Sequence, residues 1–396
     1  MRTFALLFLV FVFCLSINCC LFVRPTKFIE EPKVAVVVLW DIDTIFISSS
    51  SVYTISAKDK IIKIDNKTLI AITQSADNLV AIKTKTKERL ISSPDKIIIE
   101  SDDDILVGKN RQTLTRYRRK IEINNNVVHR FPVKNNLTAI NILPIEEYLY
   151  GVVSCEIGMA KENEFEAIKA QAVCARSYTM ALIGKRKDFD LYASYLYDQE
   201  YQGKEREYPL AIKAVQSTRG EIITFKDEPA LTQYHACCGG RTTNGRYPYL
   251  VSIIDAPRHS QHSKPYCKDS PHFEWKVTFS LSTFTDSLLS AVKISFKTQI
   301  QPQLEINKTT KRVEQIKFTL DKEYKITGEQ IRKMFNLKST LFNLKIKKDT
   351  VEILGNGWGH GIGLCQYGAL AMARENINYH KILHHYYSGV KIKKVY

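Results

Sequence analysis

One stretch of the chain, residues 141–182, constrains the fold most, because it places strong helix signals on both sides of an isolated acid. Pro144 predicts the start of a first helix, since a proline at the first helical position gives up no hydrogen bond, and this helix is expected to end near residues 151–154. A second helix is predicted from Asn163, because the glutamate three residues later completes a capping-box pattern and apolar residues then recur every three or four positions. Glu156 lies between the two helices, an arrangement typical of a functional site.

The size and charge of the chain narrow its class. With 396 residues it has room for two or three domains, and 44% hydrophobic with 25% charged residues is the composition of an ordinary globular protein, which excludes disordered and fibrous classes. The 57 Lys and Arg residues outnumber the 41 Asp and Glu residues and give a net charge of +16. This excess suits an anionic partner such as nucleic acid, a membrane surface or an acidic glycan, but a generally basic envelope protein is an equal alternative.

The first residues have the pattern of an export segment. Residues 3–23 contain no charge and are flanked by basic residues, so residues 1–30 are interpreted as a signal anchor or a signal peptide. An uncleaved anchor, or a lipid anchor at Cys19 or Cys20, is favoured. The protein is therefore expected in the cell envelope, membrane-anchored or exported, on the extracytoplasmic face.

Strand-like runs of β-branched residues occupy the chain from residue 33 to about residue 136. Apolar and polar residues alternate in several of them, which indicates half-buried antiparallel strands. Residues 33–110 contain no cluster of chemically active residues and are interpreted as an accessory region. The expected fold class is α+β, with a central helical segment packed on antiparallel β structure and a β-rich accessory region at the N-terminus.

Eight segments, taken in order, resemble the SpoIID/LytB family of bacterial cell-wall proteins. They are LPIEEYLYGVVSCEI, EAIKAQAVCARSY, YQG, YHACCGGRT, PYLVSI, GEQIRKMFNLKSTLF, GNGWGHGIGLCQYGALAMA and ILHHYYSGVKI. The resemblance implies an exported α+β protein whose SpoIID/LytB-like domain is residues 111–396, with a variable β insertion at about residues 279–327. SpoIID members of the family are lytic transglycosylases that act on peptidoglycan, and LytB members modify an amidase.

Glu156 stands where the family has its essential glutamate, although Ile157 and Gly158 replace the Met-Pro of the family pattern. The resemblance implies that Glu156 is the catalytic acid. Apolar neighbours such as Val152 and Met159 are expected to form a cleft that raises the pKa of the carboxyl toward the working pH. Glu156 would protonate the glycosidic oxygen and then, as a carboxylate, accept the proton of the muramyl C6 hydroxyl, which closes onto C1.

Further residues in these motifs are expected to bind or orient the substrate: Arg176, Gln171, Ser177, Tyr201, His235, Gly239, Gly240, Arg241, Trp358, His360, Gln366 and Tyr367. The guanidinium of Arg176 suits either Glu156 or a lactyl carboxylate, and a salt bridge with a glutamate such as Glu146 or Glu166 is the structural alternative. The glycines of this set would let a glycan approach backbone N–H donors. Sugars would stack on the faces of its aromatic rings and on that of Trp275. For these residues the alternatives are packing and a structural turn.

Six cysteines follow the N-terminal segment, and an exported chain permits disulfides. The expected pairing is Cys267 with Cys237 or Cys238. A zinc site that adds nearby histidines and a cysteine nucleophile activated by a histidine are the two alternatives. Residues 191–202 lack the Cys and His residues with which some SpoIID relatives bind zinc, so that site is not expected here. No metal and no cofactor are expected.

These interpretations combine into one expected function. The chain is expected to be a lytic transglycosylase that cleaves peptidoglycan glycan strands, stripped of stem peptides, to 1,6-anhydromuramyl ends. Its partners would be glycan strands and, through the N-terminal segment, the membrane; a cell-wall amidase is a second candidate partner, and nucleic acid is not expected. The alternative function is a non-catalytic, LytB-like amidase enhancer or cell-wall-binding protein.

Overall fold

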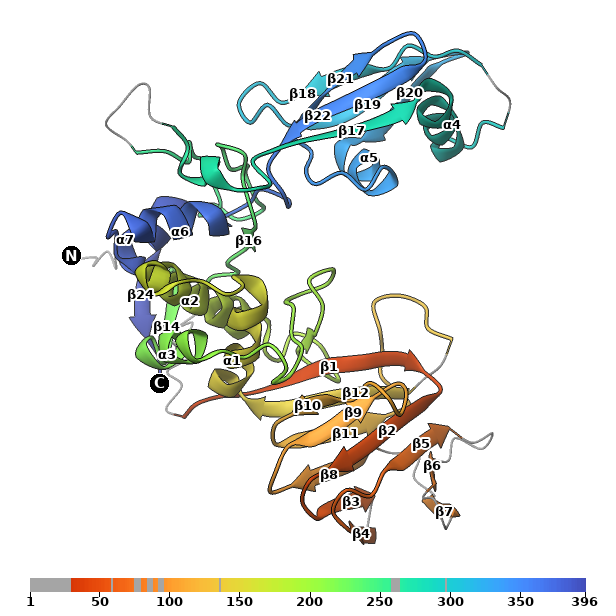
Figure 1. The fold of residues 1–396 in the computed structure, drawn as a ribbon, viewed down its shortest axis with the longest axis vertical. Helices are drawn as coiled ribbons and strands as arrows, with labels where there is room; N and C mark the ends of the chain where they lie inside the picture. Colours follow the sequence, from red (N-terminus) through yellow and green to blue (C-terminus); the bar gives the residue numbers. More distant parts are fainter. Residues whose placement is uncertain are drawn as a thin grey trace, which may run out of the picture.

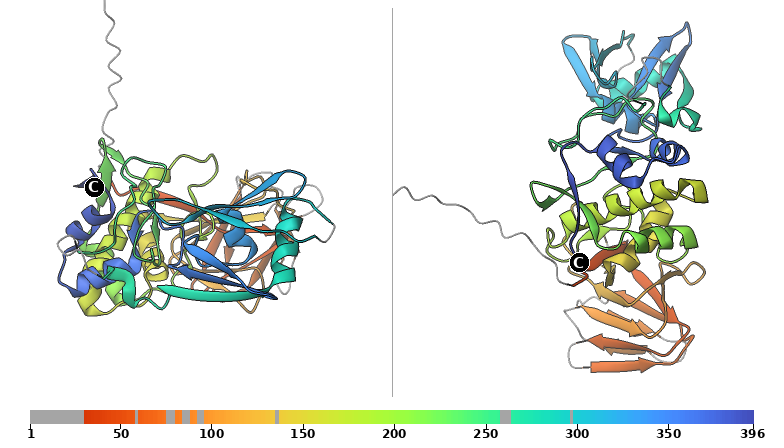
Figure 2. Two further views of the ribbon diagram at one scale, coloured as in Figure 1. Left: turned by 90° about the horizontal axis from the view of Figure 1, so that it is seen from above. Right: turned by 90° about the vertical axis from the view of Figure 1, so that its left-hand side faces the viewer.

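The computed structural model describes residues 30–57, 60–74, 80–83, 88–91, 96–134, 137–257, 264–295 and 298–396. Three parts follow one another along the long axis of the molecule: an N-terminal β lobe, a helical layer and a second β lobe (Figure 1). The same three parts are seen in the right-hand view of Figure 2. Helices and sheets are thus both present, as the sequence predicted for an α+β protein.

The N-terminal β lobe consists of two sheets, a seven-stranded one in the order β13-β1-β12-β11-β8-β3-β4 and a six-stranded one in the order β10-β9-β2-β5-β6-β7. Burial alternates along β3, which confirms half-buried strands. The strands are β1 Lys33–Ile42, β2 Thr44–Ser49, β3 Tyr53–Ala57, β4 Lys60–Ile64, β5 Ile70–Gln74, β6 Val80–Lys83, β7 Glu88–Ile91, β8 Ile97–Ser101, β9 Ile105–Gly108, β10 Thr115–Tyr117, β11 Lys120–Asn124, β12 Leu137–Pro144 and β13 Leu191–Tyr192.

The predicted boundary at residue 110 cuts through this lobe. Strand β12 pairs along its length with β1, and β11 pairs with both β12 and β8, all antiparallel. Residues 111–144 therefore complete the sheet that residues 33–110 begin. The sequence did not reveal this because strand pairing between distant segments leaves no local pattern.

The helical layer surrounds α2, which packs against α1, α3, α6, α7 and β14. Four of its alanines, Ala167, Ala170, Ala172 and Ala175, are fully buried, and small side chains let neighbouring elements approach closely. The elements of this layer are α1 Ile145–Glu156, η1 Glu162–Glu164, α2 Phe165–Leu182, α3 Pro209–Ser217, β14 Glu221–Phe225, β15 Glu228–Pro229, β16 Tyr234–His235, β23 Leu364–Cys365, α6 Gln366–Arg374, α7 Tyr379–Tyr386 and β24 Lys391–Lys394.

The second β lobe is larger than the predicted insertion at 279–327. Its first strand pairs with its last, β17 with β22, so the lobe begins before residue 279 and ends after residue 350. It has a hydrophobic core of its own, which includes Phe284 and Ile353. The elements are η2 Tyr266–Asp269, which precedes the lobe, β17 Glu274–Ser280, α4 Leu281–Ala291, β18 Gln303–Ile306, β19 Val313–Thr319, β20 Glu323–Thr327, α5 Gly328–Met334, β21 Phe342–Ile346 and β22 Thr350–Asn356.

The ends of the two central helices differ from the prediction. Helix α1 continues to Glu156, two residues beyond the expected end. The carboxylate that closes the start of the second helix belongs to Glu164, whose Oε2 accepts the Lys161 N–H at 2.6 Å, so the capping box predicted at Asn163 is wrong. The Glu166 carboxylate instead accepts the N–H of Tyr379, at the start of α7.

No helix among the described residues is long and apolar enough to span a bilayer. The segment at residues 3–23, where an anchor is predicted, lies outside the described residues.

A buried ion pair joins the elements of the helical layer. Arg176 on α2 is fully buried and binds Glu146 on α1 through two parallel bonds, Nε to Oε1 and Nη2 to Oε2, each of 2.8 Å. The same guanidinium donates to the carbonyl oxygens of Val215 and Glu221, both at 3.1 Å. Such a fully bonded pair is stable, but either member left alone would be an uncompensated buried charge.

We expect Glu146→Gln to reduce the free energy of unfolding by about 3–5 kcal/mol, because it leaves the Arg176 charge buried without a carboxylate. The measurement is the urea unfolding midpoint of the full chain. The control is Glu205→Gln, which removes the partner of Arg116 in an exposed pair with side chains 52% and 39% accessible. That change should cost about 0–1 kcal/mol, and equal losses in the two variants would contradict a structural role for the buried pair.

Candidate active site

Glu156 is the last residue of α1, and the turn that follows it presents its carboxyl group. Gly158 has a φ of 69°, a left-handed conformation that ends the helical path. The Tyr208 hydroxyl donates to the Gly158 carbonyl at 2.7 Å and fixes the turn. The residues that replace Met-Pro here thus form an ordered helix end.

The Glu156 carboxyl is half-buried and accepts one backbone hydrogen bond, from the N–H of Glu200 to Oε1 at 2.8 Å. Burial raises its pKa to about 7, against the lowering effects of the Glu200 N–H and a hydrogen bond from the Tyr234 side chain. Among the described residues no lysine, arginine or histidine forms an ion pair with Glu156. An acid of this kind holds its proton near neutral pH and can also release it.

Of the sequence neighbours predicted to form an apolar cleft around Glu156, Val152 is buried in the core and Met159 is 89% exposed. The groups around the carboxyl come from distant segments, Glu200 after β13 and Tyr234 on β16.

A hydrogen-bond network orients the tyrosine beside the acid. Gln199 is fully buried, and its Nε2 donates to the Tyr234 hydroxyl oxygen at 2.9 Å. The Gln199 Oε1 accepts from Thr179 at 2.9 Å and from Tyr148 at 3.3 Å, which fixes the direction of the amide. Because the Tyr234 oxygen already accepts a hydrogen bond, its own proton is available to the Glu156 carboxylate.

The two predicted histidines lie beside a loop of glycines, residues 355–363, here called the glycine loop. Gly359 has a φ of 110°, and a Cβ there would lie 2.7 Å from the Cβ of His235, so only glycine fits. The ring of His235 contacts that of His360 edge-on at 5.5 Å. Burial lowers the pKa of His235 well below its usual value and that of His360 to about 4, so both rings are neutral at pH 7.

Backbone hydrogen bonds join the glycine loop to the turn after β16. Cys237 exchanges two backbone hydrogen bonds with Trp358, of 3.0 and 2.7 Å, and Gly239 and Gly240 continue the turn with positive φ as predicted. Trp358 is 44% exposed, with His272 against it at 4.2 Å and the Lys338 ammonium 5.8 Å from its ring. It is therefore the predicted stacking residue whose face remains most accessible.

Other predicted substrate residues are inside the protein. Arg176 forms the buried pair with Glu146, which is the structural alternative, and Tyr201 donates to Asn141 at 2.9 Å in the core. Gln171 is buried, and its Oε1 accepts from Gln366 at 3.4 Å. The buried Ser177 accepts the Ile223 N–H at 2.7 Å, and the indole of Trp275 donates to the Gly357 carbonyl at 2.9 Å. Arg241 and Tyr367 are half-buried.

Three residues next to Glu156 were missed from the sequence: Gln199, Glu200 and Tyr234. The first two belong to the segment DQEYQG, and Tyr234 directly precedes His235 in a recognised motif. Their position in or next to the motifs YQG and YHACCGGRT was the available signal, but nothing local to either segment indicates that both converge on Glu156.

The expected disulfide is absent. All six described cysteines are free, and the Sγ atoms of Cys238 and Cys267 are 3.4 Å apart, a non-bonded contact. The prediction was right that these two side chains meet and wrong that they are bonded in this structure. Two further groups, Cys365 and Asp255, meet them at the same place.

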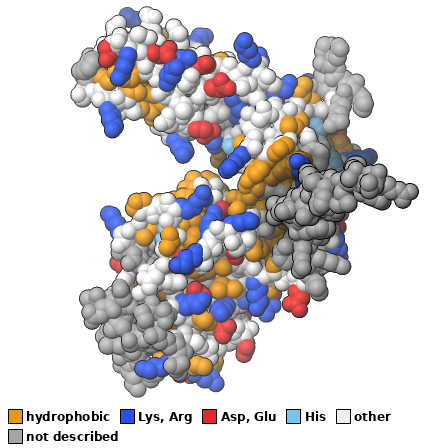
Figure 3. All heavy atoms as spheres, turned by 180° about the vertical axis from the view of Figure 1, so that it is seen from behind, with side chains coloured by type: hydrophobic (Ala, Val, Ile, Leu, Met, Phe, Trp, Pro, Cys, Tyr) orange, Lys and Arg blue, Asp and Glu red, His pale blue; other side chains and the backbone are white. Residues whose placement is uncertain are grey.

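Figure 3 shows a hollow between the second β lobe and the N-terminal β lobe, closed on one side by the helical layer. Lys and Arg side chains lie along both rims. The hollow is open to solvent on this face, and its basic rims suit an anionic ligand.

The fold and the site together define an α+β protein with a single desolvated glutamate at a helix end. A family model described as stage II sporulation protein matches residues 133–225, and a second, described as a domain of unknown function, matches residues 243–363. The first match contains Glu156 and its partner Glu200; the second contains most of the second β lobe.

Individual relatives point to the same family as the first of these two models. The chain is 29% identical to stage II sporulation protein D of Bacillus amyloliquefaciens over 274 residues, which are 65% of this chain and 76% of that protein. It is 31% identical to an uncharacterized protein of Brachyspira hyodysenteriae over 273 residues, 66% of this chain and 70% of that protein. It is 27% identical to the amidase enhancer of Bacillus subtilis over 299 residues, 62% of this chain and 40% of that protein. The chain belongs to the SpoIID/LytB family.

The raised pKa of Glu156 predicts a pH-dependent stability. Between its usual value of 4.5 and about 7 the folded chain retains a proton that the unfolded chain has lost, so raising the pH through this window destabilises the fold. The full cost above pH 7 is about 3 kcal/mol. We expect Glu156→Gln to stabilise the chain by up to this amount at pH 8 and by little at pH 4, measured from urea midpoints at both values. Glu162→Gln, at an exposed site on η1, is the control for loss of one charge; a gain independent of pH in Glu156→Gln would contradict the assignment.

Proposed function

We propose that this protein is a lytic transglycosylase of the cell wall, which cleaves peptidoglycan glycan strands with Glu156 as acid and then base. The observation that carries the proposal is the half-buried Glu156 carboxyl with a pKa of about 7 and no described ion-pair partner. Membership of the SpoIID/LytB family, with relatives named stage II sporulation protein D and amidase enhancer, supports a role in the cell wall.

The chemistry needs only one carboxyl group. Protonated Glu156 donates its proton to the glycosidic oxygen as the bond to the muramyl C1 breaks, and the resulting carboxylate accepts the proton of the C6 hydroxyl. The C6 oxygen then forms a bond to C1, which gives a 1,6-anhydro end and regenerates the acid. Because the nucleophile belongs to the substrate itself, its effective concentration is high.

The nearest second carboxylate has other partners. Glu200 supplies its backbone N–H to Glu156, while its Oε1 accepts from Gln202 at 2.9 Å and its Oε2 from the Tyr195 N–H at 3.3 Å. A hydrolase with two acting carboxylates would need the second one directed at a water molecule. The arrangement at Glu156 therefore favours the single-acid mechanism.

The substrate class follows from charge. Glycan stripped of its stem peptides exposes a carboxylate on each muramyl lactyl group, and the basic rims of the hollow suit such a polyanion. Binding should weaken with salt, because exposed charges are screened over about 8 Å at physiological ionic strength. An extracytoplasmic place in the cell envelope, with the N-terminal segment as anchor, completes the proposal.

The direct test is incubation of the full chain, purified in mild detergent, with denuded and with peptide-bearing glycan strands, and detection of 1,6-anhydromuramyl products by mass spectrometry. We expect products from the denuded strands and a loss of roughly 10²- to 10⁴-fold in rate for Glu156→Gln, the range for removal of a general acid.

Absence of product from both strand types would reject the enzymatic function. A chain that forms no product but stimulates a cell-wall amidase would support the alternative, a non-catalytic amidase enhancer. The Glu156→Gln variant keeps the size of the side chain and its bond from the Glu200 N–H, so loss of folding is not the expected cause of its inactivity.

The tyrosine beside the acid gives a second prediction. Tyr234→Phe removes a hydrogen bond that lowers the pKa of Glu156, so this pKa rises further. We expect the loss of activity on the alkaline side to move to higher pH and the maximal rate to fall by roughly tenfold, equivalent to one hydrogen bond. The measurement is the pH profile of product formation.

Tyr178→Phe is the matched control, because its hydroxyl donates to Asp198 at 3.3 Å rather than to Glu156. Identical pH profiles for wild type and Tyr234→Phe would show that the tyrosine does not act on the acid.

A further inference from the structure

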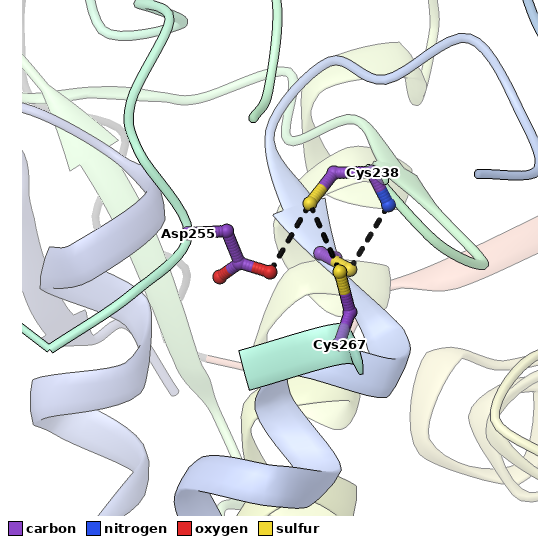
Figure 4. Close-up of side chains that lie close together, drawn as sticks. Cys238, Asp255 and Cys267 are labelled. Carbon is purple, nitrogen blue, oxygen red and sulfur yellow. Dashed lines mark hydrogen bonds between the residues drawn. The ribbon is translucent and has the colours of Figure 1, made fainter. Parts of the chain in front are cut away.

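Four buried ligand groups meet next to the glycine loop: the thiols of Cys238, Cys267 and Cys365 and the carboxylate of Asp255, here called the thiol cluster. All ligand atoms lie within 4.8 Å of one another. Figure 4 shows Cys238, Asp255 and Cys267 facing one another, with the Cys238 sulfur 3.4 Å from that of Cys267 and 3.1 Å from Asp255 Oδ2. Ligands of a tetrahedral zinc ion, at about 2.0–2.3 Å from the metal, stand roughly 3.3–3.8 Å apart. The thiol cluster is thus already close to the size of a zinc coordination shell.

Backbone amides are directed at two of the sulfur atoms. The Gly240 N–H donates to Cys238 Sγ at 3.3 Å. The N–H groups of Cys238 and Gly368 donate to Cys365 Sγ at 3.2 and 3.4 Å. Cys365 also caps the N-terminus of α6, where the helix dipole favours a negative charge. These bonds stabilise thiolates, the form of cysteine that binds metal ions.

Two groups on the side of Asp255 that faces away from the sulfur atoms fix the direction of its carboxylate. Its Oδ1 accepts from the Tyr386 hydroxyl at 2.7 Å and lies 3.5 Å from His385 Nε2, which leaves Oδ2 directed at the thiols. A Cβ at position 368 would lie 2.7 Å from Oδ2, so Gly368 makes room for the carboxylate at the start of α6. Outer hydrogen bonds of this kind are characteristic of groups that bind metals.

A buried arginine supplies positive charge beside the cluster. Arg312, from the second β lobe, is 5% exposed and donates to the Cys238 carbonyl at 3.1 Å, while its Nε is buried without a hydrogen-bond partner. No ion pair with a described carboxylate accounts for this charge. Three thiolates and a carboxylate around Zn²⁺ carry a net negative charge, which would compensate a buried guanidinium.

From these contacts we propose that the thiol cluster is a structural zinc site with Cys238, Cys267, Cys365 and Asp255 as its four ligands. Four protein ligands leave no position for water, which is the mark of structural rather than catalytic zinc. Binding displaces the thiol protons into solvent, so affinity falls as the pH is lowered. This site replaces the expectation that the chain binds no metal.

The zinc ion would cross-link three segments of the chain that no disulfide joins. Cys238 follows β16, Cys267 lies in η2 ahead of the second β lobe, and Cys365 follows the glycine loop. A disulfide between Cys238 and Cys267 would join only two of them and would leave the Cys365 thiol and the Asp255 carboxylate buried together without a shared partner. The full donor set is therefore better explained by an ion than by a disulfide.

The test is the metal content of the full chain, purified without chelators and measured by mass spectrometry of the elements. We expect one zinc per chain, and at least a tenfold loss of bound zinc in Cys267→Ser and Cys365→Ser. Tyr386→Phe, which removes the bond to Asp255, should weaken zinc binding roughly 10- to 100-fold. Cys155→Ser, at a half-buried thiol outside the cluster, should retain the metal.

A second measurement does not depend on the folding of variants. Removal of zinc from the wild type with a strong chelator should lower its unfolding temperature and expose three additional thiols to a thiol reagent; Zn²⁺ should reverse both changes and Mg²⁺ should not. Absence of zinc together with a Cys238–Cys267 disulfide in peptide maps would overturn the proposal. Loss of zinc in Cys237→Ser but not in Asp255→Asn would overturn the choice of Asp255 as the fourth ligand. None of these readouts uses glycan, so the outcome is independent of the proposed enzymatic function.

Discussion

The buried pair of Arg176 and Glu146 joins the first two helices of the helical layer to each other and to the segments packed around them. Glu146 belongs to α1, which follows directly from β12 of the N-terminal β lobe, and Arg176 belongs to the central helix α2. The carboxylate also accepts from the Tyr396 hydroxyl and from the Gly220 N–H. This one ion pair thus contacts segments that lie between residues 146 and 396 of the chain. Each polar atom of the pair has a hydrogen-bond partner, which is the condition for burying two charges without loss of stability.

The two ends of α1 have opposite electrostatic conditions. At its start a carboxylate is fully paired and structural; at its end Glu156 has one backbone donor, a tyrosine hydroxyl and, within the described part of the chain, no ion pair with a cation. The second condition costs stability whenever Glu156 is ionised, and such a cost is typical of residues retained for chemistry. The network through Gln199 keeps the tyrosine in place without adding a charge.

Much of this layout was predictable from local patterns. The start of a helix directly after Pro144, the second helix and the turn at Gly239 and Gly240 all follow from rules that act within a few residues. The position of Glu156 came from motif order. What could not be predicted depends on contacts between distant segments: the pairing of β12 with β1, the arrival of Tyr234 beside Glu156, and the meeting of Cys365 with Cys238. Arg176 shows the same limit, since its sequence context fits a substrate ligand and an ion pair equally well.

The position of Arg312 determines how the second β lobe is attached to the glycine loop. Its guanidinium fills the space that a Cβ on Gly361 would occupy, and it reaches there from the turn that leads into β19 of the second β lobe. A swing of that lobe away from the helical layer would have to pull a charged group out of a close-fitting, polar slot. Arg312 thus holds the second β lobe against the glycine loop, and any side chain introduced at Gly361 would have to displace this guanidinium.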